Sequence, residues 1–156
     1  MIYVHSLGRA VRNYGEQIAL SFGSKRLTFN ELHNRVERTA AALSRRGLRT
    51  GDRLAVLLPN GPEYIELVYA CSRLGVIVVP LNARYSSREI DRVLKDTSPR
   101  ALVRHSGSTP TRARANLQWQ LALDKEPLDA LKGIVPRSLL LSRGDSSDHL
   151  HQRHHR

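Results

Sequence analysis

Residues 51–81 read GDRLAVLLPNGPEYIELVYACSRLGVIVVPL and place a helical segment between two apolar runs. The first run, 53–58, ends at a Pro-Asn-Gly turn, and the second, 76–79, is β-branched without polar alternation. Continuous apolar runs of this kind are typical of parallel strands buried on both faces. Between them, Pro62 suits the first turn of a helix and Gly75 suits its end. The stretch therefore predicts a βαβ unit with a right-handed crossover.

Strands and helices alternate on both sides of this unit. Apolar residues at helical spacing predict two earlier helices, and Ser86-Ser87-Arg88-Glu89 is a capping box that opens a later one. The further predicted elements are a helix over 3–14, hairpin strands at 18–22 and 26–29, a helix over 31–46 and a strand from 101. We expect an α/β fold over residues 3–104, with an incomplete parallel or mixed sheet and flanking helices.

The pattern changes from about His105. Residues 106–115 are rich in Ser, Thr, Pro and Arg without a period, and 116–132 form only a weak helix candidate. We predict that residues 105–156 are an irregular, frameshifted and largely disordered tail, because this composition cannot bury a core.

The formal net charge of +11 raises the question of nucleic-acid binding. The basic residues are spaced singly along the predicted helices, without the run and interleaved aromatics that are typical of strand binding. We expect no specific nucleic-acid partner, only a weak, salt-sensitive attraction to polyanions.

Three features of the sequence bear on its compartment. No stretch approaches the ~18 consecutive apolar residues of a membrane-spanning helix. The first residues do not combine a basic segment with an apolar run, as a secretory signal would. A single cysteine, Cys71, excludes an internal disulfide and fits a reducing environment. We expect a cytoplasmic protein without a transmembrane segment.

Several residues invite a functional interpretation, and for each we favour a structural one. Cys71 fits a small buried hydrophobe better than a nucleophile, and we expect Glu63 and Glu66 to be solvent-exposed charges. Ser86 and Ser87 fit a helix cap, because no base is placed to activate either hydroxyl.

The remaining candidates are weaker still. The tail histidines His151, His154 and His155 lack the fixed scaffold of a metal site. The glycines Gly8, Gly15, Gly23 and Gly47 do not have the spacing of a phosphate-binding loop. A single aromatic residue in a polar stretch, Trp119, is weak evidence for a partner-binding site. We therefore assign no catalytic, cofactor-binding or metal-binding residue.

Three blocks in order resemble the adenylate-forming superfamily of acyl-CoA synthetases, aryl-acid ligases and peptide-synthetase adenylation domains. They are LTFNEL at 27–32, GDRLAVLLPN at 51–60 and RLGVIVVPLN at 73–82. The resemblance covers about 3–104, and PLNAR at 80–84 is most similar to the fatty-acyl and related CoA ligases.

The resemblance implies a ligase that uses ATP, Mg and CoA. A fatty or related carboxylic acid attacks the α-phosphate to give an acyl-adenylate and pyrophosphate, and the CoA thiol then displaces AMP. In this superfamily the groups that contact ATP, acyl chain and CoA come later in the chain, so the chain is expected to need no cofactor and to be inactive alone. The family's phosphate loop, Tyr-Thr-Ser-Gly-Thr-Thr-Gly-x-Pro-Lys-Gly, is not in the sequence.

The loop is permitted in another reading frame. Codons for residues 145–156, DSSDHLHQRHHR, read one base later, permit Thr-Ala-Ala-Ile-Ile-Tyr-Thr-Ser-Gly-Thr-Thr-Gly. We interpret the chain as a ligase truncated by a frame change between about His105 and Asp145. The alternative is a non-enzymatic interaction module that docks on a partner protein. Because the chain has few helices to cover an apolar sheet, we also expect self-association through uncovered strands.

Overall fold

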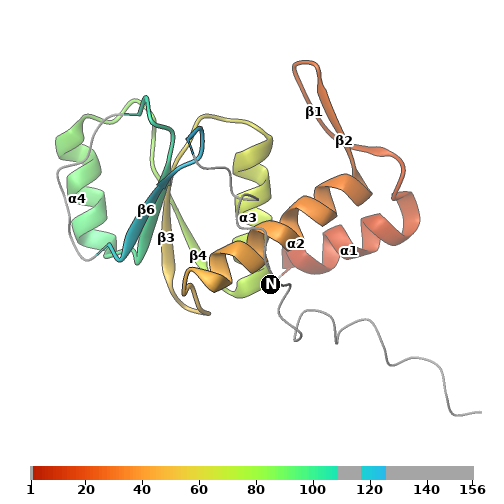
Figure 1. Ribbon diagram of the computed structural model, residues 1–156, viewed down its shortest axis with the longest axis horizontal. Helices are drawn as coiled ribbons and strands as arrows, with labels where there is room; N and C mark the ends of the chain where they lie inside the picture. The colour runs from red at the N-terminus through yellow and green to blue at the C-terminus, as the bar shows by residue number, and fades with distance from the viewer. Residues whose placement is uncertain (1, 109–116, 126–156) are drawn as a thin grey trace, which may run out of the picture.

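The computed structural model describes residues 2–108 and 117–125 (Figure 1). Its elements alternate between helix and strand, as an α/β fold requires. They are α1 (Ile2–Tyr14), β1 (Ile18–Phe22), β2 (Lys25–Thr28), α2 (Phe29–Arg45), β3 (Arg53–Leu57), α3 (Pro62–Leu74), β4 (Ile77–Pro80), α4 (Ser87–Thr97), β5 (Ala101–Arg104) and β6 (Trp119–Ala122). The predicted fold class is confirmed.

Four parallel strands form the central sheet in the order β4-β3-β5-β6. Leu54 of β3 lies opposite Val78 of β4 on one side and Ala101 of β5 on the other. Strands β1 and β2 form a separate antiparallel hairpin, which projects away from the sheet beside α1 and α2 (Figure 1).

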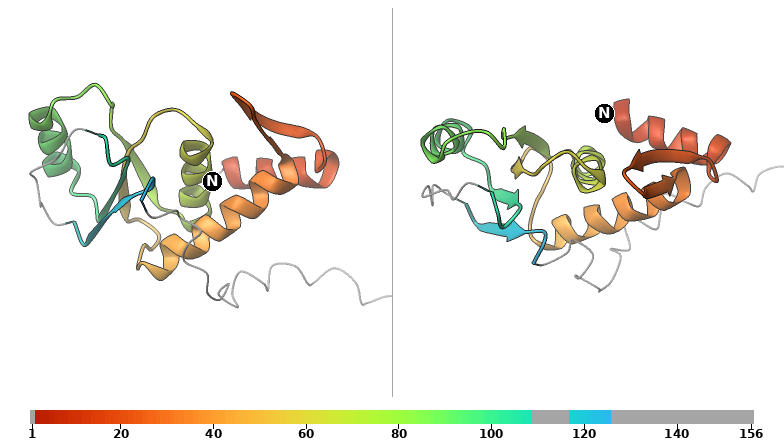
Figure 2. Two further views of the ribbon diagram at one scale, coloured as in Figure 1. Left: turned by 45° about the horizontal axis from the view of Figure 1, so that its top comes forward. Right: turned by 90° about the horizontal axis from the view of Figure 1, so that it is seen from above.

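Helices cover both faces of the two central strands. On one face Leu54, Val56 and Val103 pack in a core with residues of α2 and α3, and on the other Ala55 and Leu57 pack in a core with residues of α4. The view from above shows α4 on the opposite side of the sheet from α2 and α3 (Figure 2). The alternating side chains of one strand thus enter two separate cores.

This arrangement corrects the expectation of an uncovered sheet. Residues 54–57 and 101–103 are buried, so the chain's own helices cover β3 and β5. The run at 76–79 was expected to be buried on both faces, but β4 is an edge strand and Ile77 is 51% exposed. Self-association therefore stays a prediction, with the sheet edges as its only basis.

The segment after β5 also departs from expectation. Residues 119–122 form β6 in parallel register with β5, so the weak helix predicted over 116–132 is wrong for the described residues 117–125. Residues 119–122 therefore belong to the sheet, within the segment that was expected to be irregular. The rest of the predicted tail, 126–156, lies outside the described residues, and the boundary at 104 stays a prediction.

Two capping boxes start helices α2 and α4. At α2 the Thr28 hydroxyl accepts a hydrogen bond from the Glu31 N–H, and the Glu31 carboxylate accepts one from the Thr28 N–H. At α4 the Ser86 hydroxyl and the Glu89 carboxylate form the same pair of bonds with each other's N–H groups. Such reciprocal bonds satisfy donors that a helix start leaves free. Within the described parts of the chain, no helix has the length and apolar character needed to cross a membrane.

Candidate functional site

The strand order singles out one place at the edge of the sheet. From β3 the chain crosses through α3 to β4, whereas from β5 it continues to β6 on the opposite side. Ligands of open parallel sheets bind outside the carboxyl ends of strands where the connections diverge in this way. The carboxyl ends of β3 and β5 are therefore the candidate site.

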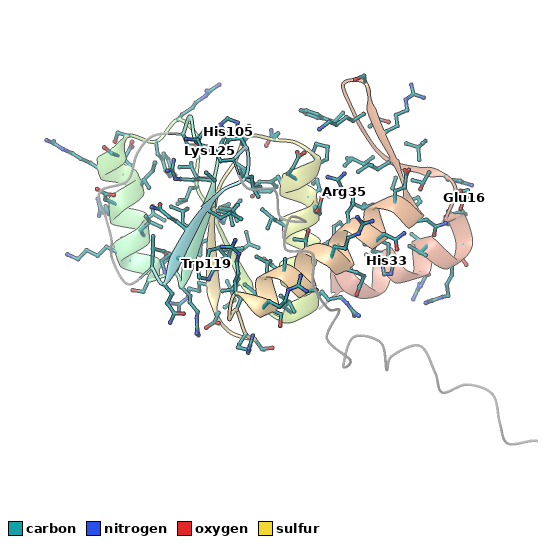
Figure 3. The ribbon with its side chains drawn as sticks, in the orientation of Figure 1. Glu16, His33, Arg35, His105, Trp119 and Lys125 are labelled. Carbon is teal, nitrogen blue, oxygen red and sulfur yellow. The ribbon has the colours of Figure 1, made fainter. Side chains whose placement is uncertain are left out.

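Residues 105–108 approach the end of β3 from β5. The His105 N–H and the Ser108 hydroxyl both donate to the Leu57 carbonyl oxygen, each over 3.3 Å. The Gly107 N–H donates to His105 Nδ1 over 3.2 Å, so the proton of a neutral imidazole lies on Nε2. His105 and Lys125 are exposed and lie at the same end of the molecule (Figure 3).

Asp124 closes this edge by binding the segment after β5. Its carboxylate accepts from the Ser106 hydroxyl and, over 2.7 Å, from the Ser106 N–H. These bonds lower the pKa of Asp124 to about 2. A carboxylate with so low a pKa does not take the hydroxyl proton near neutral pH, so Ser106 is not activated as a nucleophile. The pair acts as a clamp between the ends of β5 and β6.

The donor set at this edge does not fit a metal ion. Within 2–108 and 117–125, no three His, Cys, Asp or Glu side chains are grouped closely enough to hold a metal ion. Mg²⁺ prefers carboxylates together with substrate phosphates, and Asp124 is already bonded to Ser106. The described residues thus border the candidate site, and they supply no group from which a reaction step can be derived.

Two of the sequence interpretations are confirmed. Cys71 is fully buried, and burial raises the pKa of its thiol to about 12, which keeps it protonated and unreactive. Ser86 is the N-cap of α4, and Ser87 is the first residue of that helix.

The interpretation of Glu66 is wrong. Only 8% of its side chain is exposed, because it faces α2, where Arg35 Nε donates to it over 2.8 Å and Thr39 Oγ1 over 2.6 Å. Glu63, three residues earlier, is 43% exposed and pairs with Lys25 at 3.5 Å, as expected for a surface charge. The two carboxylates therefore do not form a catalytic pair.

Trp119 has an internal role that the sequence analysis missed. Its Nε1–H donates to the Arg46 carbonyl oxygen over 3.0 Å, and the Arg46 guanidinium lies 5.3 Å from its ring centroid. These contacts fasten β6 to the end of α2. Alternation of Trp119, Leu121 and Leu123 with smaller or polar residues is the signal that could have revealed the strand.

The glycines singled out from the sequence lie on separate segments, so they do not converge on one ligand. Gly8 is in α1, Gly15 follows it, Gly23 is in the hairpin turn and Gly47 follows α2. His151, His154 and His155 lie outside the described residues.

Comparison with known proteins identifies the family. The family model described as AMP-binding enzyme matches residues 7–147. The chain belongs to the AMP-binding enzyme family. A feruloyl-CoA synthase from Amycolatopsis sp. is 35% identical over 147 residues, which are 89% of this chain and 30% of that protein. A long-chain fatty acid–CoA ligase from Mycobacterium tuberculosis is 32% identical over 85 residues, 54% of this chain and 17% of the relative.

Solved structures of the AMP-binding family share the fold. The o-succinylbenzoate CoA synthetase of Bacillus subtilis, bound to its acyl-adenylate intermediate, has a TM-score of 0.71 and 30% identity over 79% of this chain and 32% of its own. The chain thus spans about a third or less of the relatives it matches. The resemblance seen in the sequence is confirmed, and it corresponds to the N-terminal portion of these enzymes.

The sequence blocks that carry the family resemblance have identifiable structural roles. The block at 27–32 contains the capping box of α2, and the blocks at 51–60 and 73–82 contain β3 and β4 with the turns before them. All three shape the backbone, and none contributes a reactive group among the described residues.

Proposed function

We propose that this chain is the N-terminal scaffold of an acyl-CoA ligase that activates a fatty or related carboxylic acid. The observation that carries the proposal is the family match together with the order β4-β3-β5-β6, which places the carboxyl ends of β3 and β5 side by side where the connections diverge. The relatives named above, whose names give feruloyl, long-chain fatty and succinylbenzoyl substrates, support this substrate class.

The scaffold is proposed to position the carboxyl ends of β3 and β5, without taking part in the chemistry. The buried central strands and the helices on both faces of the sheet position this edge, and Asp124 accepts hydrogen bonds from the segment after β5. ATP, Mg and CoA are proposed to be bound by parts of the whole enzyme outside residues 2–108 and 117–125, where no group of His, Cys, Asp or Glu could hold a metal ion. The chain alone is therefore proposed to be inactive.

A frame change accounts for the sequence of 145–156 in this proposal. Strand β6 pairs in register with β5 and packs Leu121 into the core, which supports placing the change after Lys125. A sequence read out of frame before this point would not be expected to keep an alternating strand pattern.

Two measurements test the proposal. Calorimetry of the chain with Mg-ATP at physiological salt should give no saturable heat, and micromolar binding would contradict it. The gene read through 126–156 should contain the phosphate loop one base out of frame, and a repaired gene should give pyrophosphate release with carboxylic acids. Codons that do not yield the loop would refute the frame change.

A second candidate function is favoured by one observation: β3 and β5 are covered on both faces by the chain's own helices. A chain that covers its own central strands in this way could fold without further domains, as an interaction module would. Sedimentation and dye binding separate the candidates, because a monomer with one sharp melt and no dye binding favours the module. Self-association with dye binding favours a scaffold that lacks its remaining domains.

A further inference from the structure

The β1–β2 hairpin is bonded to the start of α2 at its base. The Phe29 N–H donates to the Gln17 carbonyl oxygen over 3.0 Å, and the Asn30 N–H donates to the Gly15 carbonyl oxygen over 2.9 Å. Asn30 Nδ2 also donates to the Glu16 carboxylate over 2.6 Å. Because Phe29 packs against the core as well, the base of the hairpin is firmly attached to the fold.

The tip of the hairpin reaches the start of α3 through two side chains. Lys25 Nζ lies 3.5 Å from the Glu63 carboxylate, and the two side chains are 67% and 43% exposed. Phe22 Cε1 lies 4.0 Å from the position that a Cβ on Gly61 would take, although half of Phe22 remains exposed. Exposed ion pairs contribute little to stability. The tip is therefore held much more weakly than the base.

The hairpin itself favours local opening at the tip. Among the described residues it consists of two strands only, and a two-stranded hairpin is marginally stable in water. The register of β1 shifts between Ile18 and Leu20, and such an irregularity lets a strand bend. Segments with few buried contacts open with a free energy well below that of global unfolding.

The contact at the tip borders the candidate site. Gly61 belongs to the turn that leaves the carboxyl end of β3 and enters α3 at Pro62. The hairpin and His105 lie at the same end of the molecule (Figure 3). A closed tip thus shields one side of this turn, and an open tip exposes it to solvent.

We propose that Lys25 and Glu63 form a salt-sensitive latch, which holds the hairpin tip against the turn at 59–61 and releases it when the ion pair is weakened. Release opens the carboxyl edge of the sheet on the side of α3. Arg26, the next residue, lies opposite Ser21 and points to the other face of the hairpin, so it is not part of the latch. The latch depends on the fold alone and is independent of ligase activity.

Amide hydrogen exchange of the whole chain tests the latch residue by residue. Lys25→Gln should speed exchange of the hydrogen-bonded amides at 20–27 about twofold, as expected for loss of an exposed ion pair. Arg26→Gln removes the same charge from the same strand and should leave these rates unchanged. Raising the salt to roughly 1 M should speed exchange in the wild type but not in Lys25→Gln, because salt screens the exposed pair.

Two internal references complete the experiment. The amides of residues 17, 29 and 30 report on the base and should keep their rates in every variant, and Lys25→Arg keeps the ion pair and should behave as the wild type does. Equal acceleration in Lys25→Gln and Arg26→Gln would show a general effect of charge and overturn the latch. Equal acceleration of tip and base would overturn it too, since the whole hairpin would then detach.

Discussion

The Gly51 N–H donates to the Gly75 carbonyl oxygen over 2.8 Å, so the turn that precedes β3 is bonded to the turn that precedes β4. Thr50 adds a second bond, from its hydroxyl to the Leu74 carbonyl oxygen over 2.9 Å. Both glycines have positive φ, 86° and 70°. The second and third sequence blocks are thus joined at their glycines, which sets the two strands in register.

Replacing Gly75 with Ala should destabilise the fold by about 3 kcal/mol. An L-residue at positive φ is strained by roughly 1–2 kcal/mol, and the new Cβ would lie 2.8 Å from Thr50 Cγ2, an overlap that adds a further cost. Urea unfolding measures the change. The control is Gly23→Ala, which has φ 58° but no atom within 4 Å of its Cβ, and should cost only about 1 kcal/mol. Equal costs would show that Thr50 yields freely.

Replacing Glu66 with Ala should cost about 2–3 kcal/mol, because it leaves the buried Thr39 hydroxyl without its acceptor and removes the carboxylate that accepts from Arg35 Nε. Glu63→Ala on the same helix is the matched control and should change the free energy of unfolding by less than ~0.5 kcal/mol. The two variants are compared by chemical denaturation. Similar small effects would show that α2 and α3 are held by apolar contacts alone.

Trp119 is the sole tryptophan of the chain, so its fluorescence reports on β6. Because its Nε1–H bonds to Arg46 and β6 pairs with β5, fluorescence and far-ultraviolet circular dichroism should show coincident unfolding transitions. A fluorescence transition at lower denaturant would mean that β6 detaches before the remaining sheet. Trp119→Phe should lower stability by about 1 kcal/mol through loss of the hydrogen bond.

Asp124 should give the fold an acid-sensitive component. Its pKa is lowered to about 2 by Ser106, so its contribution is fully present above the ordinary value of 3.8 and is lost as the pH falls through about 2. Asp124→Asn should therefore be less stable than the wild type at neutral pH, and the difference should vanish near pH 2. An NMR titration of the carboxyl with a midpoint near 3.8 would contradict the clamp.

Much of this fold follows from local patterns. Pro62, Gly75 and the Ser86 capping box marked helix ends that the structure keeps, since these residues act through their own backbone or nearest neighbours. The central run at 53–58 predicted a strand buried on both faces, and β3 is one.

The misses involve contacts between distant residues. Glu66 resembled a surface charge because its partners, Arg35 and Thr39, lie on another helix. Likewise Ile77 is exposed because β4 lies at the sheet edge, a position that strand order sets and a single segment does not reveal.

The strand order also has a consequence for synthesis on the ribosome. Strand β3 pairs with β5, and Trp119 closes onto Arg46 from 73 residues away, so the sheet completes only after most of the described chain has emerged. Pairings between distant segments form slowly, since a long loop must close first. Until residues 119–122 are available, the outer edge of β5 has no strand beside it and can pair with another nascent chain. The timing of translation through 105–118 therefore bears on the yield of correctly folded protein.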